Sequence, residues 1–281
     1  MSINILWLED EFKESKLAGT IAKAQKLGFE ITFCEFANDF ISNIDTIEWD
    51  AIILDVIGKR NSGDTLSSDG FNLAFDKVLA SYKDRPWFVF SGQTEITKKD
   101  SLIRERLTAE HCQREYAEII YVKGDDNDKL FKDIENVVKN NEDWQLRREY
   151  TDIFATSVDK NITLKLLKAL KKKESKDTSL LNDVRKILED IFNECCTKGL
   201  FEASVREIND RKRRLVGHTS IPKYIQRNID SVTVISQEGS HTQSQTYKDI
   251  NSGKAPHLIG STISDLLNII LWWDQYKNEN P

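Results

Sequence analysis

The chain has 281 residues, with 40 basic and 46 acidic side chains and a formal net charge of −6. Because domains commonly span about 100–200 residues, this length predicts two of them. Apolar residues make up 39% of the sequence and charged residues 31%, which is typical of globular domains and excludes wholesale disorder. No apolar run reaches the about 20 residues of a membrane helix, and the start resembles no secretory signal. We expect a cytoplasmic protein that does not enter a membrane, with its four cysteines reduced.

The first half of the sequence alternates short apolar runs with amphipathic stretches. Strands are predicted where the runs are short, apolar and bounded by polar residues, at 3–8, 30–36, 49–56, 87–90 and 119–122. Helices are predicted from apolar residues at helical spacing, at 11–27, 39–44, 71–82, 101–116 and 129–139. This alternation predicts an α/β domain over residues 1–140, with a five-stranded parallel sheet wound on both faces.

The second half is predicted to be mainly helical. Its helices are expected at 142–155, 162–172, 180–196, 221–235 and 256–276, with loops at 171–178 and 236–255. We divide it into a helical linker region, 141–178, and a helical effector or interaction domain, 179–281. Residues 1–140 are acidic overall, whereas the second half is slightly basic and has basic clusters at 171–173 and 211–214. We interpret both clusters as solvated surface.

Polar side chains follow the predicted strands of the first half. Glu9 and Asp10 come after the first strand, Asp55 after the third, Ser91 after the fourth and Lys123 after the fifth. Because the carboxyl ends of parallel strands meet at one edge of a sheet, we expect these side chains to lie close together. Clustered carboxylates repel one another unless a cation is present, so we predict a Mg²⁺ site there. The hydroxyl and the lysine are suitable donors for phosphoryl oxygens.

This arrangement resembles the receiver domain of two-component response regulators. The resemblance spans residues 1–140 and is carried by the motifs ILWLEDE, IILDV, VFSG and YVKG. It implies a flavodoxin-like fold and a place in a phosphorelay, with a histidine kinase or a phosphotransfer protein as partner. It also implies that Asp55 is the phosphoacceptor and that Ser91 and Lys123 contact the phosphoryl group. The Mg²⁺ ligands that it implies are Asp10 and Asp55, Glu9 through water, and Ile57 through its carbonyl oxygen.

The loop after Asp55 departs from the receiver pattern. Where the family commonly has Met-Pro, this sequence has Ile57-Gly58. The Asp-Gly pair that usually follows soon afterwards is Asp69-Gly70, which comes only after the polar insertion 59–68.

The region around Lys123 departs from the pattern as well. It is followed by Gly124 in place of the usual proline. The position of the aromatic switch residue falls on Ile120, and Tyr121, one place further on, should face the opposite side of the sheet. These departures leave phosphorylation as expected, but they leave open whether it is coupled to output.

The helical half has a more distant resemblance to HEPN-type domains. It is carried by residues 184–191, 221–224 and 238–241, and by a final helix ending in Leu-Trp-Trp at 271–273. Ribonucleases of that group have an arginine, then four to six other residues, and then a histidine. His241 has no such arginine. Arg211 and Arg213 both have this spacing to His218, but they fall in a predicted loop.

We therefore expect no nuclease, and no enzymatic activity beyond self-catalysed phosphorylation and dephosphorylation of Asp55. Two classes of function remain open. In the first, phosphorylation switches a helical output domain that binds a partner or forms a homodimer through the apolar final helix. That apolar face could equally pack within its own domain. The alternative is a phosphorylation-switched effector that binds nucleic acid or acts as a HEPN-like ribonuclease.

Overall fold

The computed structural model describes residues 2–11, 15–81, 85–92, 102–111, 120–156 and 160–280. The chain divides into two compact units, residues 1–145 and 146–281, which are considered separately. The predicted ranges 11–27, 71–82, 101–116 and 119–122 extend in part outside the described residues. No helix of the described residues is long and apolar enough to span a membrane.

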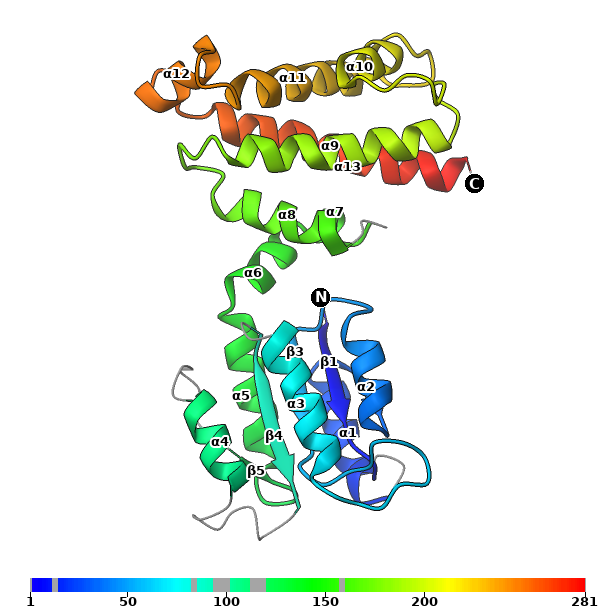
Figure 1. Cartoon of the computed structure of the whole chain (residues 1–281), viewed down its shortest axis with the longest axis vertical. Helices are drawn as coiled ribbons and strands as arrows, with labels where there is room; N and C mark the ends of the chain where they lie inside the picture. The colour runs from blue at the N-terminus through cyan, green and yellow to red at the C-terminus, as the bar shows by residue number, and fades with distance from the viewer. Residues whose placement is uncertain are drawn as a thin grey trace. The chain divides into compact units, whose positions relative to one another are not determined.

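The first unit contains a five-stranded, wholly parallel sheet with the order β2-β1-β3-β4-β5 (Figure 1). Its strands are β1 (Ile3–Leu8), β2 (Phe29–Cys34), β3 (Ala51–Leu54), β4 (Trp87–Ser91) and β5 (Tyr121–Val122). Its helices are α1 (Ser15–Lys26), α2 (Ala37–Ile44), α3 (Asp69–Ser81), α4 (Leu102–His111) and α5 (Asn127–Lys139). The predicted α/β fold is confirmed, with the strand order of flavodoxin-like proteins.

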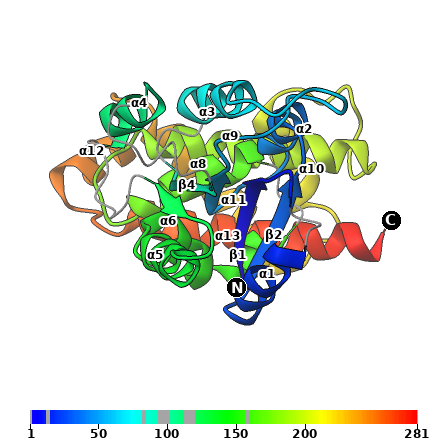
Figure 2. The same ribbon diagram turned by 90° about the horizontal axis from the view of Figure 1, so that it is seen from below.

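Helices cover both faces of this sheet (Figure 2). Successive side chains of a strand point to opposite faces, and here both sets are apolar. On one face, Leu6 and Val89 pack with residues of α2, α3 and α4, and on the other, Trp7 and Phe90 pack with residues of α1 and α5. This double burial explains why the strands appear in the sequence as continuous apolar runs.

Ile120, just before β5, and Tyr121, its first residue, lie on opposite faces of the sheet, as predicted. Ile120 belongs to the core beneath α2, α3 and α4, whereas Tyr121 is fully buried in the core on the opposite face. The Tyr121 hydroxyl donates a hydrogen bond of 2.8 Å to Oδ2 of Asp133 on α5. The aromatic ring at this strand end is therefore turned away from the face on which Ile120 lies.

The second unit is helical. Its helices are α7 (Thr151–Phe154), α8 (Lys160–Lys171), α9 (Leu180–Thr197), α10 (Ile208–Val216), α11 (Lys223–Gly239), α12 (Gln245–Ser252) and α13 (Leu258–Glu279). The boundary between the units falls within α6 (Glu142–Glu149), and α8 contributes to the core of the second unit. The range 141–178 is thus divided between the two units. The single helix predicted over 142–155 is wrong, because Tyr150, with φ −108° and ψ 42°, separates α6 from α7.

One predicted loop of this unit is helical, and another is helical in part. The basic residues 211–214 lie on α10, and the range 236–255 contains the end of α11 and all of α12. Helix α12 begins where Ser244 Oγ accepts a hydrogen bond from Tyr247 N and ends at Gly253, whose φ is 78°. The serine cap and the left-handed glycine are common features of helix ends. The residues between them are mostly polar, so the spacing of apolar residues does not indicate this helix.

The apolar face of α13 packs inside its own unit. Ile259, Ile263, Leu266, Ile270 and Trp273 are all buried in the core that α13 forms with α8, α9 and α11. Helices α9, α11 and α13 contact one another along this core. The apolar side chains of α13 were the basis for predicting a homodimer. Because they pack within their own unit, they no longer argue for it, and the homodimer stays a prediction.

Replacing Gly239 with alanine should destabilise the helical unit. A Cβ added at Gly239 would lie 2.1 Å from Cδ1 of the fully buried Leu181, so α11 or Leu181 must move. We expect the free energy of unfolding to fall by about 1–3 kcal/mol, as for other overpacked cores. Urea unfolding measures this. Gly217→Ala is the matched control, because its added Cβ meets no atom closer than 3.5 Å. Equal stability of the two variants would contradict this account of the packing.

Candidate metal-binding site

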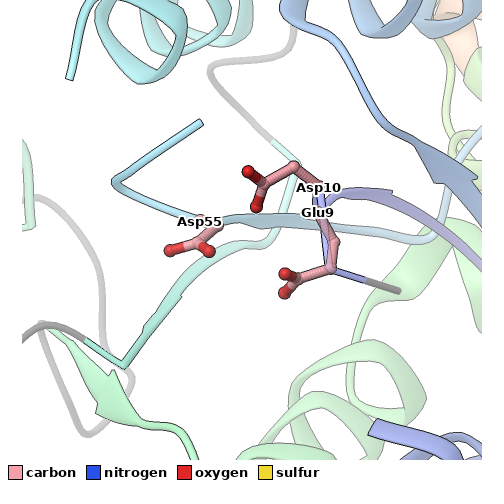
Figure 3. Close-up of side chains that lie close together, drawn as sticks. All are labelled: Glu9, Asp10 and Asp55. Atoms are coloured by element: carbon pink, nitrogen blue, oxygen red, sulfur yellow. The ribbon is translucent and has the colours of Figure 1, made fainter. Parts of the chain in front are cut away.

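Three carboxylates lie together at the carboxyl ends of β1 and β3 (Figure 3). Glu9, Asp10 and Asp55 each offer an oxygen, and these oxygens all lie within 4.8 Å of one another. The strand register places them there, because β1 and β3 are neighbours and Leu8 pairs with Leu54. The Asp55 amide also donates to the carbonyl oxygen of Leu8, at 3.0 Å. The structure therefore brings together the three carboxylates that the sequence places after these strands.

Lys123 reaches two of these carboxylates from the end of β5. Its Nζ lies 2.5 Å from Oδ2 of Asp55 and 2.8 Å from Oε1 of Glu9. Its backbone amide donates to the carbonyl oxygen of Ser91, at 3.1 Å, which joins the end of β5 to the end of β4. The ammonium group is therefore held over the carboxylates from a strand that is not a neighbour of β1.

The pKa values of all three carboxyl groups are raised, because the positive charge near them does not fully offset burial and repulsion between the carboxylates. Burial raises the pKa of Glu9 to about 7, with a further rise from the charge of Asp55 and an opposing effect of Lys123. Burial raises the pKa of Asp55 as well, although Lys123 again opposes the rise. Burial and the neighbouring Glu11 raise the pKa of Asp10. A second positive charge at this point would favour the ionised form of all three.

Lys123 itself stays positively charged. Burial lowers the pKa of its ammonium group, but the charges of Asp55 and Glu9 outweigh burial and the net shift is upward. Lys123 thus contacts two of the three carboxyl groups, and the charges of Lys123 and Lys59 offset only part of the rise in the pKa of Asp10.

The donor set matches a hard divalent cation. Carboxylate oxygens are the ligands that Mg²⁺, Mn²⁺ and Ca²⁺ prefer. Glu9 is 0% exposed, and its Oε2 is buried without a hydrogen-bond partner among the described residues, which is costly unless another group compensates. A cation would supply that compensation. Ile57 lines the same cavity, and its amide lies 3.5 Å from Oδ1 of Asp55.

Asp10 and Asp55 line a cavity of about 400 Å³, and Glu9 is buried beside them. Among the described residues, its walls are formed by Asp10, Glu11, Leu17, Thr20, Asp55, Ile57, Leu66, Gly92, Lys123, Gly124 and Asn127. Such a volume is ample for a phosphate-sized group. Ser91 is buried at the end of β4, and the neighbouring Gly92 forms the wall at this point.

Thr20 and Asn127, which no sequence pattern indicates as site residues, hold the cavity wall beside Lys123 in place. Asn127 Oδ1 accepts a hydrogen bond of 2.9 Å from the amide of Gly124, and its Nδ2 donates to Thr20 Oγ1 at 2.8 Å. Gly124 has a φ of 93°, which proline cannot adopt. The sequence does show that a glycine replaces the usual proline after Lys123. Nothing in the sequence, however, distinguishes Thr20 or Asn127 from other polar helix residues.

The basic cluster and the histidines of the second unit form no comparable site within the described residues. Arg211 donates to the carbonyl oxygen of Val205, at 3.0 Å, and Lys212 and Arg213 pair with Asp230 and Asp210 at 2.8 and 2.9 Å. His218 follows α10, with its Nδ1 2.7 Å from Ser220 Oγ, and His241 is exposed after α11. The interactions found for these basic side chains are thus with neighbours in their own unit.

Comparison with known proteins adds no family. No protein-family model matches the sequence, and a search of curated proteins gives no match.

Proposed function

We propose that the first unit is the receiver domain of a response regulator and that Asp55 accepts a phosphoryl group from a histidine kinase or a phosphotransfer protein. The observation that carries this proposal is the contact of Lys123 with Asp55 beside Glu9 and Asp10. A single buried carboxylate with a lysine would be an ordinary ion pair. Two further carboxylates within 4.8 Å and an open cavity are instead suited to a cation and an anion together.

The residues of the cavity have separate roles in this reaction. An oxygen of the Asp55 carboxylate attacks the phosphorus, and the bond from phosphorus to the donor's imidazole nitrogen breaks with its electron pair left on that nitrogen. Lys123 pairs with Asp55 beforehand and with a phosphoryl oxygen afterwards. Mg²⁺ held by Asp10, Asp55 and the carbonyl oxygen of Ile57, and by Glu9 through water, would neutralise the incoming anion.

Ser91 and the helical unit carry the response in this proposal. Ser91 would bond a phosphoryl oxygen and move the end of β4, to which the backbone of Lys123 is attached. The helical unit, which we compare with HEPN-type domains, would then bind a partner or a second copy. Nucleic acid is the less favoured target, because three of the basic side chains of α10 have partners within their own unit.

The test is labelling of the full chain with acetyl phosphate. With Mg²⁺ present, the intact mass should rise by one phosphoryl group, and peptide mapping should place that group on Asp55. A chelator should stop the labelling, because the ion would no longer screen the carboxylates from the donor. Labelling that is unaffected by the chelator, or a label that maps to another residue, would refute the proposal.

A further inference from the structure

The chain between β3 and α3 forms a closed loop, residues 58–67. The amide of Gly58 donates to the carbonyl oxygen of Ser67, and the Ser67 amide donates back to Gly58, both at 3.1 Å. Within the loop, the Asn61 amide donates to Oδ2 of Asp64 at 2.9 Å. Gly63, with a φ of 97°, supplies the left-handed turn. The closed loop 58–67 therefore has its own hydrogen bonds, outside the sheet.

Two helices hold this loop in place. At the start of α2, the Ala37 amide donates to the carbonyl oxygen of Lys59 at 3.0 Å, and Asn38 Nδ2 donates to Asn61 Oδ1 at 2.7 Å. At the start of α3, Gly70 lies so close that an added Cβ would be 3.1 Å from the Lys59 carbonyl oxygen. In Figure 1 the loop lies at the end of the sheet to which the strand arrows point. Its position over the carboxyl ends of the strands is thus set by backbone contacts.

Leu66 is the residue by which this loop reaches the cavity. The residue is 56% exposed, yet it lines the same cavity as Asp55 and Lys123. A leucine side chain that stays exposed to water adds little hydrophobic stabilisation to the fold. The two backbone hydrogen bonds that close the loop, between Gly58 and Ser67, would form equally well beside a polar residue. Together with Leu17 of α1, Leu66 adds apolar wall to a cavity whose centre is charged.

We propose that Leu66, held by the closed loop 58–67, restricts the access of water to a phosphoryl group on Asp55 and so prolongs its lifetime. This inference rests on the proposed function. In the hydrolysis, a water oxygen bonds to phosphorus as the bond from phosphorus to the Asp55 oxygen breaks. The electron pair returns to the Asp55 carboxylate, and the proton of the water passes to phosphate or solvent. Attack requires a water in line with the breaking bond, and an apolar side chain at the mouth of the cavity disfavours that water.

The test compares Leu66→Ser with Leu73→Ser in the full chain. Leu73, on α3, is 37% exposed, but it is not among the residues that line the cavity. Each protein is labelled with acetyl phosphate and Mg²⁺, the donor is removed, and the loss of label is followed on a phosphate-affinity gel. Leu66→Ser should lose its label at least about threefold faster than wild type, and Leu73→Ser at the wild-type rate. Leu66→Phe, which adds apolar volume at the mouth, should lose it more slowly.

The outcomes separate this inference from the proposed function. If wild type is not labelled on Asp55, the proposed function fails, and the role of Leu66 fails with it. If wild type is labelled but decay is equal or slower in Leu66→Ser, only the role of Leu66 is overturned. Faster decay in Leu73→Ser as well would also overturn it, since any exposed leucine would then have the same effect. Circular dichroism of each variant shows whether the fold is retained, and Leu66→Ala repeats the test with a smaller change of polarity.

Discussion

Replacing Asp55 with asparagine should reduce labelling by acetyl phosphate to background. The side chain keeps its shape but loses the anionic oxygen that attacks phosphorus, so we expect a loss of at least about a hundredfold. Intact mass and a phosphate-affinity gel both report the outcome. The variant should fold as well as wild type, because the substitution removes one negative charge from a buried cluster that has three carboxyl groups and one lysine.

Asp39→Asn is the matched control for this prediction. Asp39 lies exposed on α2 and takes no part in the acidic cluster, so its variant should be labelled as wild type. Labelling of Asp55→Asn at the wild-type rate would remove Asp55 as the phosphoacceptor. Loss of labelling in both variants would point to a general effect of acidic charge on the first unit.

Of the substitutions proposed for this protein, Lys123→Met should lower the free energy of unfolding the most. The lysine side chain is 14% exposed and is the hydrogen-bonded cation shared by Glu9 and Asp55. Removing one member of a buried ion pair typically costs about 3–5 kcal/mol, because the remaining charge is left uncompensated. Protonation of Glu9, whose pKa is about 7, can offset part of this cost. We therefore expect the free energy of unfolding to fall by at least about 2 kcal/mol in urea.

The pH dependence of this loss follows from Glu9. Burial raises its pKa, so the folded state holds the proton more tightly than the unfolded chain does. Lowering the pH protonates Glu9 and so removes a buried negative charge. The deficit of Lys123→Met, meaning the amount by which its free energy of unfolding falls below that of wild type, should therefore be smaller at about pH 6 than at about pH 8. Added Mg²⁺ should also reduce the deficit. The matched control is Lys23→Met, because the pair of Lys23 with Asp128 is largely exposed and should contribute less than about 1 kcal/mol. A deficit no greater than that of the control would contradict the assigned role of Lys123.

The helices of the second unit differ in how clearly the sequence indicates them. The apolar spacing in α9 and α13 was decisive because these helices have one long buried face. Helix α10 carries Arg211, Lys212 and Arg213 in succession, so apolar spacing could not indicate it, although Leu215 near its end is fully buried in the core. Local propensity is a weak guide for such short polar helices, because packing against α11 decides whether they form.

For the first unit, the order of residues along the chain is enough to predict the parallel sheet, the double burial of its strands, and the acidic residues at the strand ends. Each depends on local periodicity and on the rule that parallel strands end at one edge. Which of these groups touch depends on the three-dimensional fold. Lys123 meets Glu9 across 114 positions of the chain, Asn127 meets Thr20 across 107, and the closed loop 58–67 brings Leu66 to the cavity. Such contacts follow from the crossover of strands and the placement of loops, which apolar spacing along the chain does not encode.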